Sequence, residues 1–320
     1  MESILEIREL RVGKDHDGHF QAILDNVNFE VKQGETLAIV GESGCGKSMT
    51  ALSIMGLLPR AIQIASGKVI FGGKDLAGLS RKEIDQVRGK DIAMIFQEPM
   101  TSLNPSFTIG NQLSEVLKIH TALQPNERKE RVLELLSQVG IPDPAGKFKS
   151  YPHELSGGMR QRVMIAMALA CNPKMLIADE PTTALDVTIQ AQVLNLLSEI
   201  QSQYQMAVML ITHDLGVVAE TCQRVIVMYA GQVIEEASVE DLFEQPMHPY
   251  TIGLMQSAPR LGVAKEKLHV IEGTVPDIRD MPTGCRFHPR CESATDLCKE
   301  KEPQLEERGH GRRVRCWHTA

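Results

Sequence analysis

Eight consecutive residues near the N-terminus have the types and spacing needed to bind the phosphates of a nucleotide. The run Gly41-Glu42-Ser43-Gly44-Cys45-Gly46-Lys47-Ser48 fits the pattern G-x-x-x-x-G-K-[ST]. In such a loop the backbone N–H groups surround the phosphates, the lysine reaches the β- and γ-phosphates, and the serine hydroxyl binds Mg²⁺. The glycines allow conformations and close approaches that a Cβ atom would prevent. The sequence predicts a nucleotide site formed by residues 41–48 together with Met49.

The segments beside this loop have the character that the motif requires. Thr36–Val40 is a short apolar run that predicts a buried strand, and Met49–Leu58 predicts a helix that stops before Pro59. A helix N-terminus favours a bound anion. A chance match to the pattern is the alternative, and the strand and helix on either side of the loop disfavour it.

Two carboxylates follow a second apolar strand. Met175–Glu180 ends in Asp179, which can hold Mg²⁺ through water, and Glu180, which can polarise an attacking water. A solvated acidic strand end is the alternative. A third strand, Ala207–Thr212, is followed by His213, at the edge where ligands bind in open α/β sheets. Taken alone, the position of His213 favours a residue without a ligand role.

A serine and two glycines precede a helical run that extends to Ala170. Ser156 is a good N-cap, and Gly157 and Gly158 leave the amides of the first turn open to an anion. Flexible loop glycines are the alternative.

The other elements must hold these groups in an α/β fold. Residues 4–33 predict short strands at 4–7, 22–24 and 27–31, with a polar loop at 13–18, and Gly72-Gly73 predicts a hairpin within 68–74. A buried strand at 92–96 ends at Gln97. Apolar residues at helical spacing in 126–139 indicate a helical insertion.

Composition limits the class of protein. The chain has 320 residues, of which 42% are hydrophobic and 23% charged, and its net charge of −7 argues against nucleic acid as the main partner. The N-terminus lacks a basic stretch followed by an apolar run, so we expect no signal peptide. The longest apolar stretch, 163–171, is too short to cross a bilayer. We therefore expect a soluble chain.

Four of the seven cysteines lie in the last tenth of the sequence. They follow a proline-rich region, 245–283, that predicts an irregular, extended appendage. A cytosolic chain seldom keeps disulfides, so this density of cysteines indicates a metal or cluster site. The spacing lacks the C-x-x-C pairs typical of zinc sites. An iron–sulfur cluster, a zinc ion and reduced thiols all remain open for Cys285, Cys291, Cys298 and Cys316.

From about residue 5 to 237 these motifs resemble, in order, those of the ATP-binding subunit of ABC transporters. They correspond to a Walker A loop, a Q-loop glutamine at Gln97, a signature at 155–162, a Walker B strand, a D-loop at Ala184-Leu185-Asp186 and a switch histidine at His213. Segments 95–105, 177–192 and 248–251 resemble the dipeptide/oligopeptide importer ATPases (DppD/OppD type). That resemblance covers essentially the whole chain.

The resemblance implies a catalytic arrangement. Two cassettes would face each other, with ATP between the Walker A loop of one and the signature of the other. Lys47 would contact the phosphates, Ser48 and Asp179 would serve Mg²⁺, and Gln97 would complete the Mg²⁺ and water shell. Glu180 would be the general base and His213 would hold the γ-phosphate. The remaining residues expected at the nucleotide are Ser156, Gly157, Gly158 and Asp186.

The resemblance also implies a fold and partners. We expect a P-loop NTPase with an N-terminal antiparallel β portion, a helical subdomain at about 98–160, a cassette spanning 1–244 and an extension at 245–320. Two transmembrane permease subunits, a second and related ATPase subunit and an extracytoplasmic peptide-binding protein would be partners, with no nucleic acid. The chain would lie at the cytoplasmic face of the membrane. Di- or oligopeptides are the expected cargo, although the family also includes glutathione and nickel importers.

Two features refine the resemblance. Members usually stack an aromatic side chain of the first strands on adenine, and no Tyr or Trp precedes the loop here, so Phe20 is the candidate, with His16 and His19 as lesser ones. Some members carry a [4Fe-4S] cluster on a tail with the pattern G-C-x-x-x-P-R-C-x-x-A-T-D-x-C, which Gly284–Cys298 matches.

Two other functions fit less well. A soluble ABC ATPase acting on DNA or ribosomes usually has paired cassettes, long coiled-coil insertions or zinc modules within the cassette, whereas this sequence has one cassette, a short helical insertion and an acidic balance. A nucleotide-binding regulator without hydrolysis is disfavoured because Glu180 and His213 are both present.

Overall fold

The computed structural model describes residues 2–16, 18–97, 102–183, 186–257, 270–309 and 311–319. The chain divides into two compact units, one formed by residues 79–210 and the other by residues 2–78 together with 211–320. The predicted D-loop residues Ala184 and Leu185 and the segment 98–101 lie outside the described residues. In the described part of the chain, no helix is both long enough and apolar enough to span a membrane.

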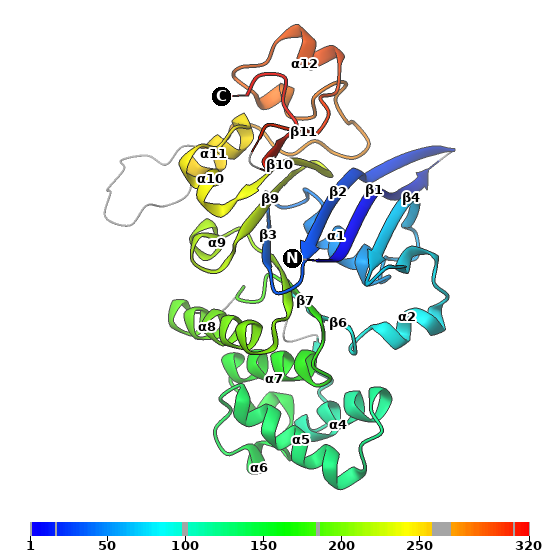
Figure 1. The fold of residues 1–320 in the computed structure, drawn as a ribbon, viewed down its shortest axis with the longest axis vertical. Coiled ribbons are helices and arrows are strands. Elements are labelled where there is room, and N and C mark those ends of the chain that lie inside the picture. The colour runs from blue at the N-terminus through cyan, green and yellow to red at the C-terminus, as the bar shows by residue number, and fades with distance from the viewer. Residues whose placement is uncertain are drawn as a thin grey trace. The chain divides into compact units, whose positions relative to one another are not determined.

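The unit of residues 79–210 combines parallel strands with a group of helices. Strand β6 pairs in parallel with β7, and the strand order here is β8-β7-β6. Figure 1 shows the helices between β6 and β7 gathered in one group. The strands are β6 (Ile92–Ile95), β7 (Met175–Asp179) and β8 (Ala207–Ile211), and the helices are α2 (Arg81–Val87), α4 (Ile109–His120), α5 (Pro125–Gln138), α6 (Pro144–Lys147), η2 (Pro152–Glu154), α7 (Gly157–Leu169) and α8 (Val187–Tyr204).

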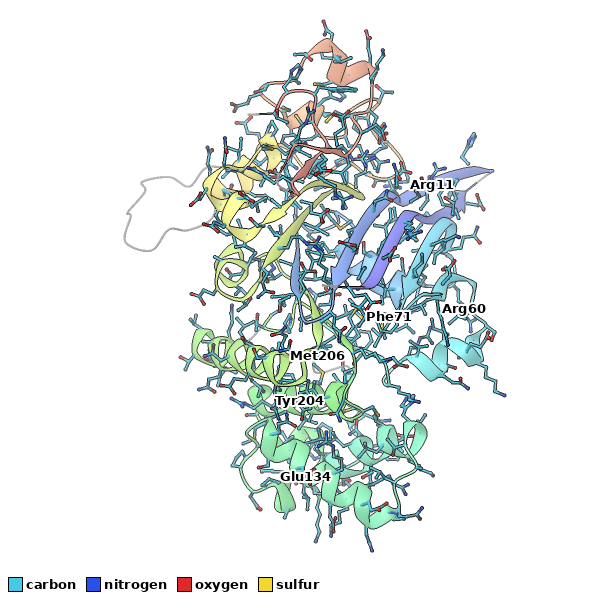
Figure 2. The ribbon with its side chains drawn as sticks, in the orientation of Figure 1. Arg11, Arg60, Phe71, Glu134, Tyr204 and Met206 are labelled. Atoms are coloured by element: carbon cyan, nitrogen blue, oxygen red, sulfur yellow. The ribbon has the colours of Figure 1, made fainter. Side chains whose placement is uncertain are left out.

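Local chemistry sets these helix boundaries. Thr108 caps α4 by accepting the N–H of Asn111, and Pro125 begins α5, where its missing N–H costs nothing. The apolar face of α5 is fully buried, and on its polar face Glu134 pairs with Arg131 at 3.3 Å. Gln138 donates to the Tyr204 hydroxyl at 3.2 Å, which joins α5 to the end of α8. Figure 2 labels Glu134 on α5 and Tyr204 at the end of α8. The helical insertion predicted from the apolar spacing is therefore present.

The other unit contains the N-terminal antiparallel sheet and the P-loop strand. The sheet has the order β2-β1-β4-β5, and Figure 1 shows β1, β2 and β4 side by side. Strand β3 pairs in parallel with β9, and β10, β12 and β11 continue from β9 in antiparallel pairs. The N-terminal elements are β1 (Ser3–His16), β2 (His19–Lys32), β3 (Thr36–Val40), α1 (Lys47–Ile54), β4 (Gln63–Phe71), β5 (Lys74–Asp75) and η1 (Leu76–Gly78).

The prediction of short strands in residues 4–33 was wrong, because β1 and β2 each span fourteen residues. Both contain a residue at positive φ, Glu9 at 49° and Asn26 at 50°, and the β1–β2 register shifts between Ile7 and Leu10. These bulges interrupt the period of two that identifies a strand in the sequence. The hairpin at Gly72-Gly73 is confirmed, with Phe71 opposite Lys74.

The C-terminal region is more ordered than an extended appendage. It forms a helix at 249–257, and β12 pairs with β10, where Glu235 lies opposite Val314. Tyr250, Phe287 and Ile271 pack in one core with Tyr229 of β9. The elements are α9 (Leu215–Thr221), β9 (Arg224–Tyr229), β10 (Gln232–Ser238), α10 (Val239–Glu244), α11 (Pro249–Ser257), η3 (His288–Arg290), α12 (Asp296–Glu300), β11 (Glu306–Glu307) and β12 (Arg313–Val314).

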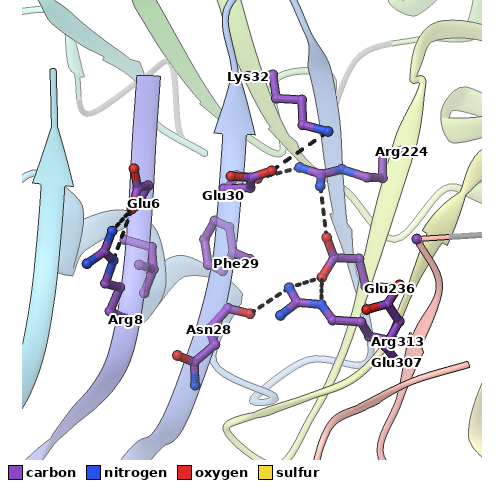
Figure 3. Close-up of a pocket in the computed structure, with 12 residues that line it drawn as sticks. Glu6, Arg8, Asn28, Phe29, Glu30, Lys32, Arg224, Glu236, Glu307 and Arg313 are labelled. Atoms are coloured by element: carbon purple, nitrogen blue, oxygen red, sulfur yellow. Dashed lines mark hydrogen bonds and ion pairs between the residues drawn. The ribbon is translucent and has the colours of Figure 1, made fainter. Parts of the chain in front are cut away.

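Buried charge also ties this region to the N-terminal sheet. Figure 3 shows Arg224 of β9 and Arg313 of β12 both pointing toward Glu236, whose side chain is 3% exposed. Arg224 also pairs with Glu35 at 2.9 Å, and Arg313 donates to the backbone oxygen of Asn28 on β2. Arg224 and Arg313 line one cavity, and the charges of both are already paired with carboxylates of the protein.

Candidate functional site

The predicted phosphate loop connects β3 to α1 and has the backbone that its glycines require. Gly41, Gly44 and Gly46 have φ of 150°, 81° and 108°. A Cβ on Gly41 would lie 2.3 Å from the Met228 oxygen, and one on Gly46 would lie 2.6 Å from a methyl group of Leu24. Glycine is therefore obligatory at both ends of the loop.

The loop lysine is buried and turned into the loop. Lys47 is 7% exposed, and its ammonium group donates to the backbone oxygens of Gly41 at 2.7 Å and Glu42 at 3.0 Å. Cys45 beneath it is fully buried, and burial raises the pKa of its thiol while the charge of Lys47 opposes that shift. Cys45 is thus a neutral space-filling residue, whereas Lys47 is a cation that already bonds the loop's oxygens. A concave loop with a central cation fits a polyphosphate.

Residues predicted to activate water converge in the unit of residues 79–210. Asp179 ends β7 and is 5% exposed, and Glu180 follows it at a φ of 48°. The Glu180 carboxylate accepts hydrogen bonds from the Gln97 amide and the Thr183 hydroxyl, each at 2.9 Å. A non-glycine residue in the left-handed region is held there by its surroundings, here beside the hydrogen bonds of the carboxylate. The sequence predicted Gln97 and Glu180 as separate site residues, and the structure joins them by a hydrogen bond.

The signature residues begin α7 in the same unit. Ser156 is the N-cap and its hydroxyl accepts the Met159 N–H at 3.3 Å, while Gly157 is exposed. A Cβ on Gly158 would lie 3.0 Å from a methyl group of Ile189 on α8, and Asp186 caps that helix by accepting the N–H of Ile189. The amides of Gly157 and Gly158 open α7, where a helix has N–H groups without intrahelical partners, and such a helix start suits an anion.

His213 and the adenine candidates lie in the unit that contains the loop. His213 is exposed two residues beyond β8. Phe20, His16 and His19 line one cavity, and the guanidinium of Arg11 lies 5.2 Å from the centre of the Phe20 ring. No pattern in the sequence marks Arg11, which the pairing of β1 with β2 brings beside Phe20.

The four C-terminal cysteines line a single cavity together with His248, Phe287 and Trp317. Burial raises the pKa of the Cys285 thiol to about 11, and the other three cysteines add to that shift. Within the described residues, no group of three or more His, Cys, Asp or Glu is arranged to hold a metal ion. The four cysteines therefore share one cavity, but the described residues show no metal-binding group there.

Sequence reasoning missed two residues that contact the loop from the C-terminal region. Tyr250 accepts the Glu42 N–H at 2.8 Å, and Arg290 pairs with the Glu42 carboxylate at 2.7 Å. Both are far from the loop in the sequence. Tyr250 lies in the segment 248–251 and Arg290 in the cysteine pattern of 284–298, and neither pattern indicates a contact with the loop.

The P-loop between β3 and α1, the carboxylates after β7 and the N-capped signature helix define an ATPase of the ATP-binding cassette class. The family profile described as ABC transporter matches residues 24–183, and the profile described as oligopeptide/dipeptide transporter, C-terminal region, matches residues 234–298. The chain belongs to the ABC transporter family of ATP-binding proteins, whose cassette uses ATP and Mg²⁺.

Curated relatives match nearly the whole chain. The dipeptide transport ATP-binding protein DppD of Haemophilus influenzae is 52% identical, covering 99% of this chain and 96% of the relative. The DppD protein of Escherichia coli is 51% identical, covering 94% and 92%. The oligopeptide transport ATP-binding protein AppD of Bacillus subtilis is 50% identical, covering 99% and 97%.

Solved structures resemble the cassette part of the chain. A dimeric, post-hydrolysis ATP-binding cassette, MJ0796, bound to ADP and phosphate is 29% identical with a TM-score of 0.66, covering 73% of this chain and 98% of that one. The cbiO1 subunit of a Clostridium perfringens ABC transporter complex is 30% identical with a TM-score of 0.66, covering 76% and 92%. The expected fold class is confirmed.

Proposed function

We propose that this chain is the ATP-hydrolysing subunit of an importer of di- or oligopeptides. One observation carries the proposal: identity of 50–52% to peptide-transport ATP-binding proteins extends over nearly the whole chain, including the C-terminal region. The cassette alone names only the ABC class, whereas the C-terminal region is described for oligopeptide and dipeptide transporters. The peptide assignment therefore depends on that region.

Each site residue has a proposed role. Lys47 leaves the oxygens of Gly41 and Glu42 to bind the β- and γ-phosphates, and Ser48 with Asp179 holds Mg²⁺, which supplies charge neutralisation at those phosphates when bound. Glu180 accepts the proton of the attacking water, and Gln97 orients that water through the hydrogen bond it makes to Glu180. Residues 41–49, with Phe20 at the adenine, hold the nucleotide, and His213 contacts the γ-phosphate.

The proposed partners follow the same family logic. A second, related ATPase subunit would present its signature to the nucleotide bound by this chain. In return, the nucleotide bound by that subunit would contact Ser156, Gly157, Gly158 and Asp186 of this chain. Two permease subunits would contact the helical unit, where Phe96 and Phe107 are 40% and 52% exposed. An extracytoplasmic peptide-binding protein would deliver cargo, and the chain would lie peripherally at the cytoplasmic face of the membrane.

Uptake by intact cells tests the proposal. A strain lacking this subunit should lose accumulation of a radiolabelled dipeptide, and the wild-type chain should restore it whereas Glu180→Gln should not. Affinity purification of the wild-type chain from solubilised membranes should recover two permease subunits. Restored uptake of nickel or glutathione without dipeptide uptake would contradict the peptide assignment, and recovery of ribosomes or DNA-bound proteins without permeases would contradict the transporter assignment.

We also propose that Cys285, Cys291, Cys298 and Cys316 hold a [4Fe-4S] cluster. The support is the convergence of the four cysteines on one cavity, together with the match of Gly284–Cys298 to the cysteine pattern of cluster-bearing family members. When bound, the cluster would cross-link the loop at 285–298 to Cys316 near β12. Burial keeps the Cys285 thiol protonated in the absence of metal, so loading requires release of its proton.

Metal analysis of anaerobically purified protein tests this assignment. A cluster requires about four irons and four acid-labile sulfides per chain, with a broad absorbance band, and replacement of Cys291 by serine should remove it. Zinc without sulfide, or no metal at all, would overturn the cluster and leave the importer function untouched.

A further inference from the structure

Glu42, the second residue of the phosphate loop, is held by two residues from the C-terminal region. The Tyr250 hydroxyl accepts its backbone N–H at 2.8 Å. The Arg290 guanidinium donates to both carboxylate oxygens, from Nη1 at 2.7 Å and from Nη2 at 3.0 Å. A bidentate pair fixes direction as well as distance. With Lys47 bonded to its backbone oxygen, Glu42 is restrained at its N–H, its C=O and its side chain.

Arg290 is itself fixed before it reaches the loop. Its side chain is 5% exposed, and it donates to the backbone oxygen of Glu272 at 2.8 Å and of Ile271 at 3.2 Å. Its guanidinium lies 5.7 Å from the Tyr229 ring centre and 5.9 Å from that of Phe287. These contacts within the C-terminal region therefore fix the position and orientation of the Arg290 guanidinium.

Tyr250 is equally constrained. It is fully buried, and its ring centre lies 4.7 Å from that of Tyr229 and 5.4 Å from that of Phe287. Burial raises the pKa of Tyr250 far above its usual range, so its hydroxyl stays neutral. The N–H of Glu42 points at this hydroxyl, which leaves the phosphates to the amides that follow it in the loop.

We propose that Tyr250 and Arg290 are positioning residues for ATP binding. By holding Glu42, the C-terminal extension keeps the loop in its phosphate-binding conformation before the nucleotide arrives. ATP then does not have to order the loop, which would otherwise cost affinity. Neither residue acts on the reacting atoms, so hydrolysis of bound ATP does not depend on them.

Equilibrium binding of MgATP to the full-length chain tests this proposal. Tyr250→Phe, which keeps the ring and removes only the hydroxyl, and Arg290→Met should each weaken binding by about tenfold. The affinity of Arg290→Lys for MgATP should lie between those of Arg290→Met and wild type, because an ammonium keeps the positive charge but cannot form the bidentate pair. The matched control is Arg308→Met, which removes an exposed arginine of the same region that pairs with Glu306 at 3.0 Å and should leave affinity unchanged.

Two further measurements separate positioning from simple destabilisation. In steady-state hydrolysis, KM for ATP should rise while kcat changes less than about twofold, since uniform binding is what is lost. In a double-mutant cycle, Arg290→Met combined with Glu42→Gln should be no weaker than either single variant, because both break the same pair.

Three results would overturn the proposal. They are unchanged MgATP affinity in Tyr250→Phe, equal weakening in Arg308→Met, or strictly additive effects in the cycle. If Arg290→Met fails to fold, Tyr250→Phe decides alone, because it keeps the aromatic packing. All readouts use binding or hydrolysis of ATP, so they are independent of which cargo the transporter carries and of whether the cysteines hold a cluster.

Discussion

At the scale of single residues, the chemistry is concentrated where the backbone is least ordinary. Glu180 follows β7 in the left-handed region and accepts two hydrogen bonds, from Gln97 and Thr183. Gly46 adopts a φ of 108° where α1 begins. Such conformations persist only where surrounding structure enforces them, and they direct side chains or amides at a substrate.

Replacing Glu180 with glutamine should abolish turnover and keep binding. The amide occupies the same volume and cannot accept a proton from water, so hydrolysis should fall by about 10²–10⁴-fold. MgATP affinity should stay within about threefold of wild type, since the amide keeps the volume of the carboxylate and loses only its ability to accept a proton. Phosphate release and equilibrium binding measure the two quantities, and residual activity above about a tenth of wild type would argue for another base.

Gly46→Ala tests the loop backbone. The new Cβ would meet Leu24 at 2.6 Å and would sit at a φ that L-residues avoid, so we expect loss of measurable ATP binding together with about 1–3 kcal/mol of stability. Gly78→Ala is the control, because a Cβ there meets nothing within 4 Å. Thermal unfolding with and without MgATP distinguishes the two variants. Nucleotide-induced stabilisation of Gly46→Ala equal to wild type would show that the loop tolerates a side chain.

At the scale of elements, serine caps the N-termini of two helices, α2 and α7, and only the cap of α7 lies at the proposed site. Ser80 caps the short helix α2 in a reciprocal box, with Glu83 accepting its N–H at 2.9 Å. Ser156 caps α7, and its exposed first turn is the proposed site for the partner's nucleotide. The same interaction thus occurs once in a structural setting and once in a proposed catalytic one.

Alanine at both caps separates these roles. Ser80→Ala and Ser156→Ala should each lower the free energy of unfolding by about 1 kcal/mol, measured in urea. Only Ser156→Ala should also reduce ATP hydrolysis of the assembled transporter, because its hydroxyl would otherwise face the partner's γ-phosphate. Equal hydrolysis in the two variants would remove Ser156 from the proposed site.

At the scale of the whole molecule, the C-terminal extension belongs to the same compact unit as the phosphate loop and packs in one core with β9. Tyr250 and Phe287 pack against Tyr229, and β12 extends the sheet beside β10. We retain 1–244 and 245–320 as the proposed division of the chain into cassette and extension. Their shared core predicts that they are not independent in stability.

Ending the chain after Glu244 should therefore also destabilise the remaining cassette. It removes Tyr250, Phe287 and Val314, all buried, and exposes the face of Tyr229 and Ile234. Each such side chain contributes about 1.5–3 kcal/mol of burial, so several are comparable with a typical total stability of about 5–15 kcal/mol. We expect an aggregated or unfolded product by circular dichroism and gel filtration. A monomeric cassette with wild-type melting temperature would contradict this.

Arg224→Met probes the buried charge shown in Figure 3. Glu35 and Glu236 are 8% and 2% exposed and share this arginine, so its removal should cost about 3–5 kcal/mol. Arg279→Met, which breaks an exposed pair with Asp277, is the control and should leave the free energy of unfolding unchanged. Urea unfolding of the full-length chain compares them, and a cost below 1 kcal/mol for Arg224→Met would mean that Arg313 compensates.

The sequence by itself determined the ATPase class, the phosphate loop, the helical insertion and the order of the site residues. These depend on contiguous residues, because glycine conformations, helix caps and apolar periods are local properties. The lengths of β1 and β2 could not be predicted from the sequence, because bulges at Glu9 and Asn26 interrupt the alternation of apolar and polar residues. Only the tertiary structure joined Glu42 to Tyr250 and Arg290, 208 and 248 residues away, and brought the four cysteines to one cavity. Contacts over such separations are selected by packing of the whole core, and no local pattern encodes them.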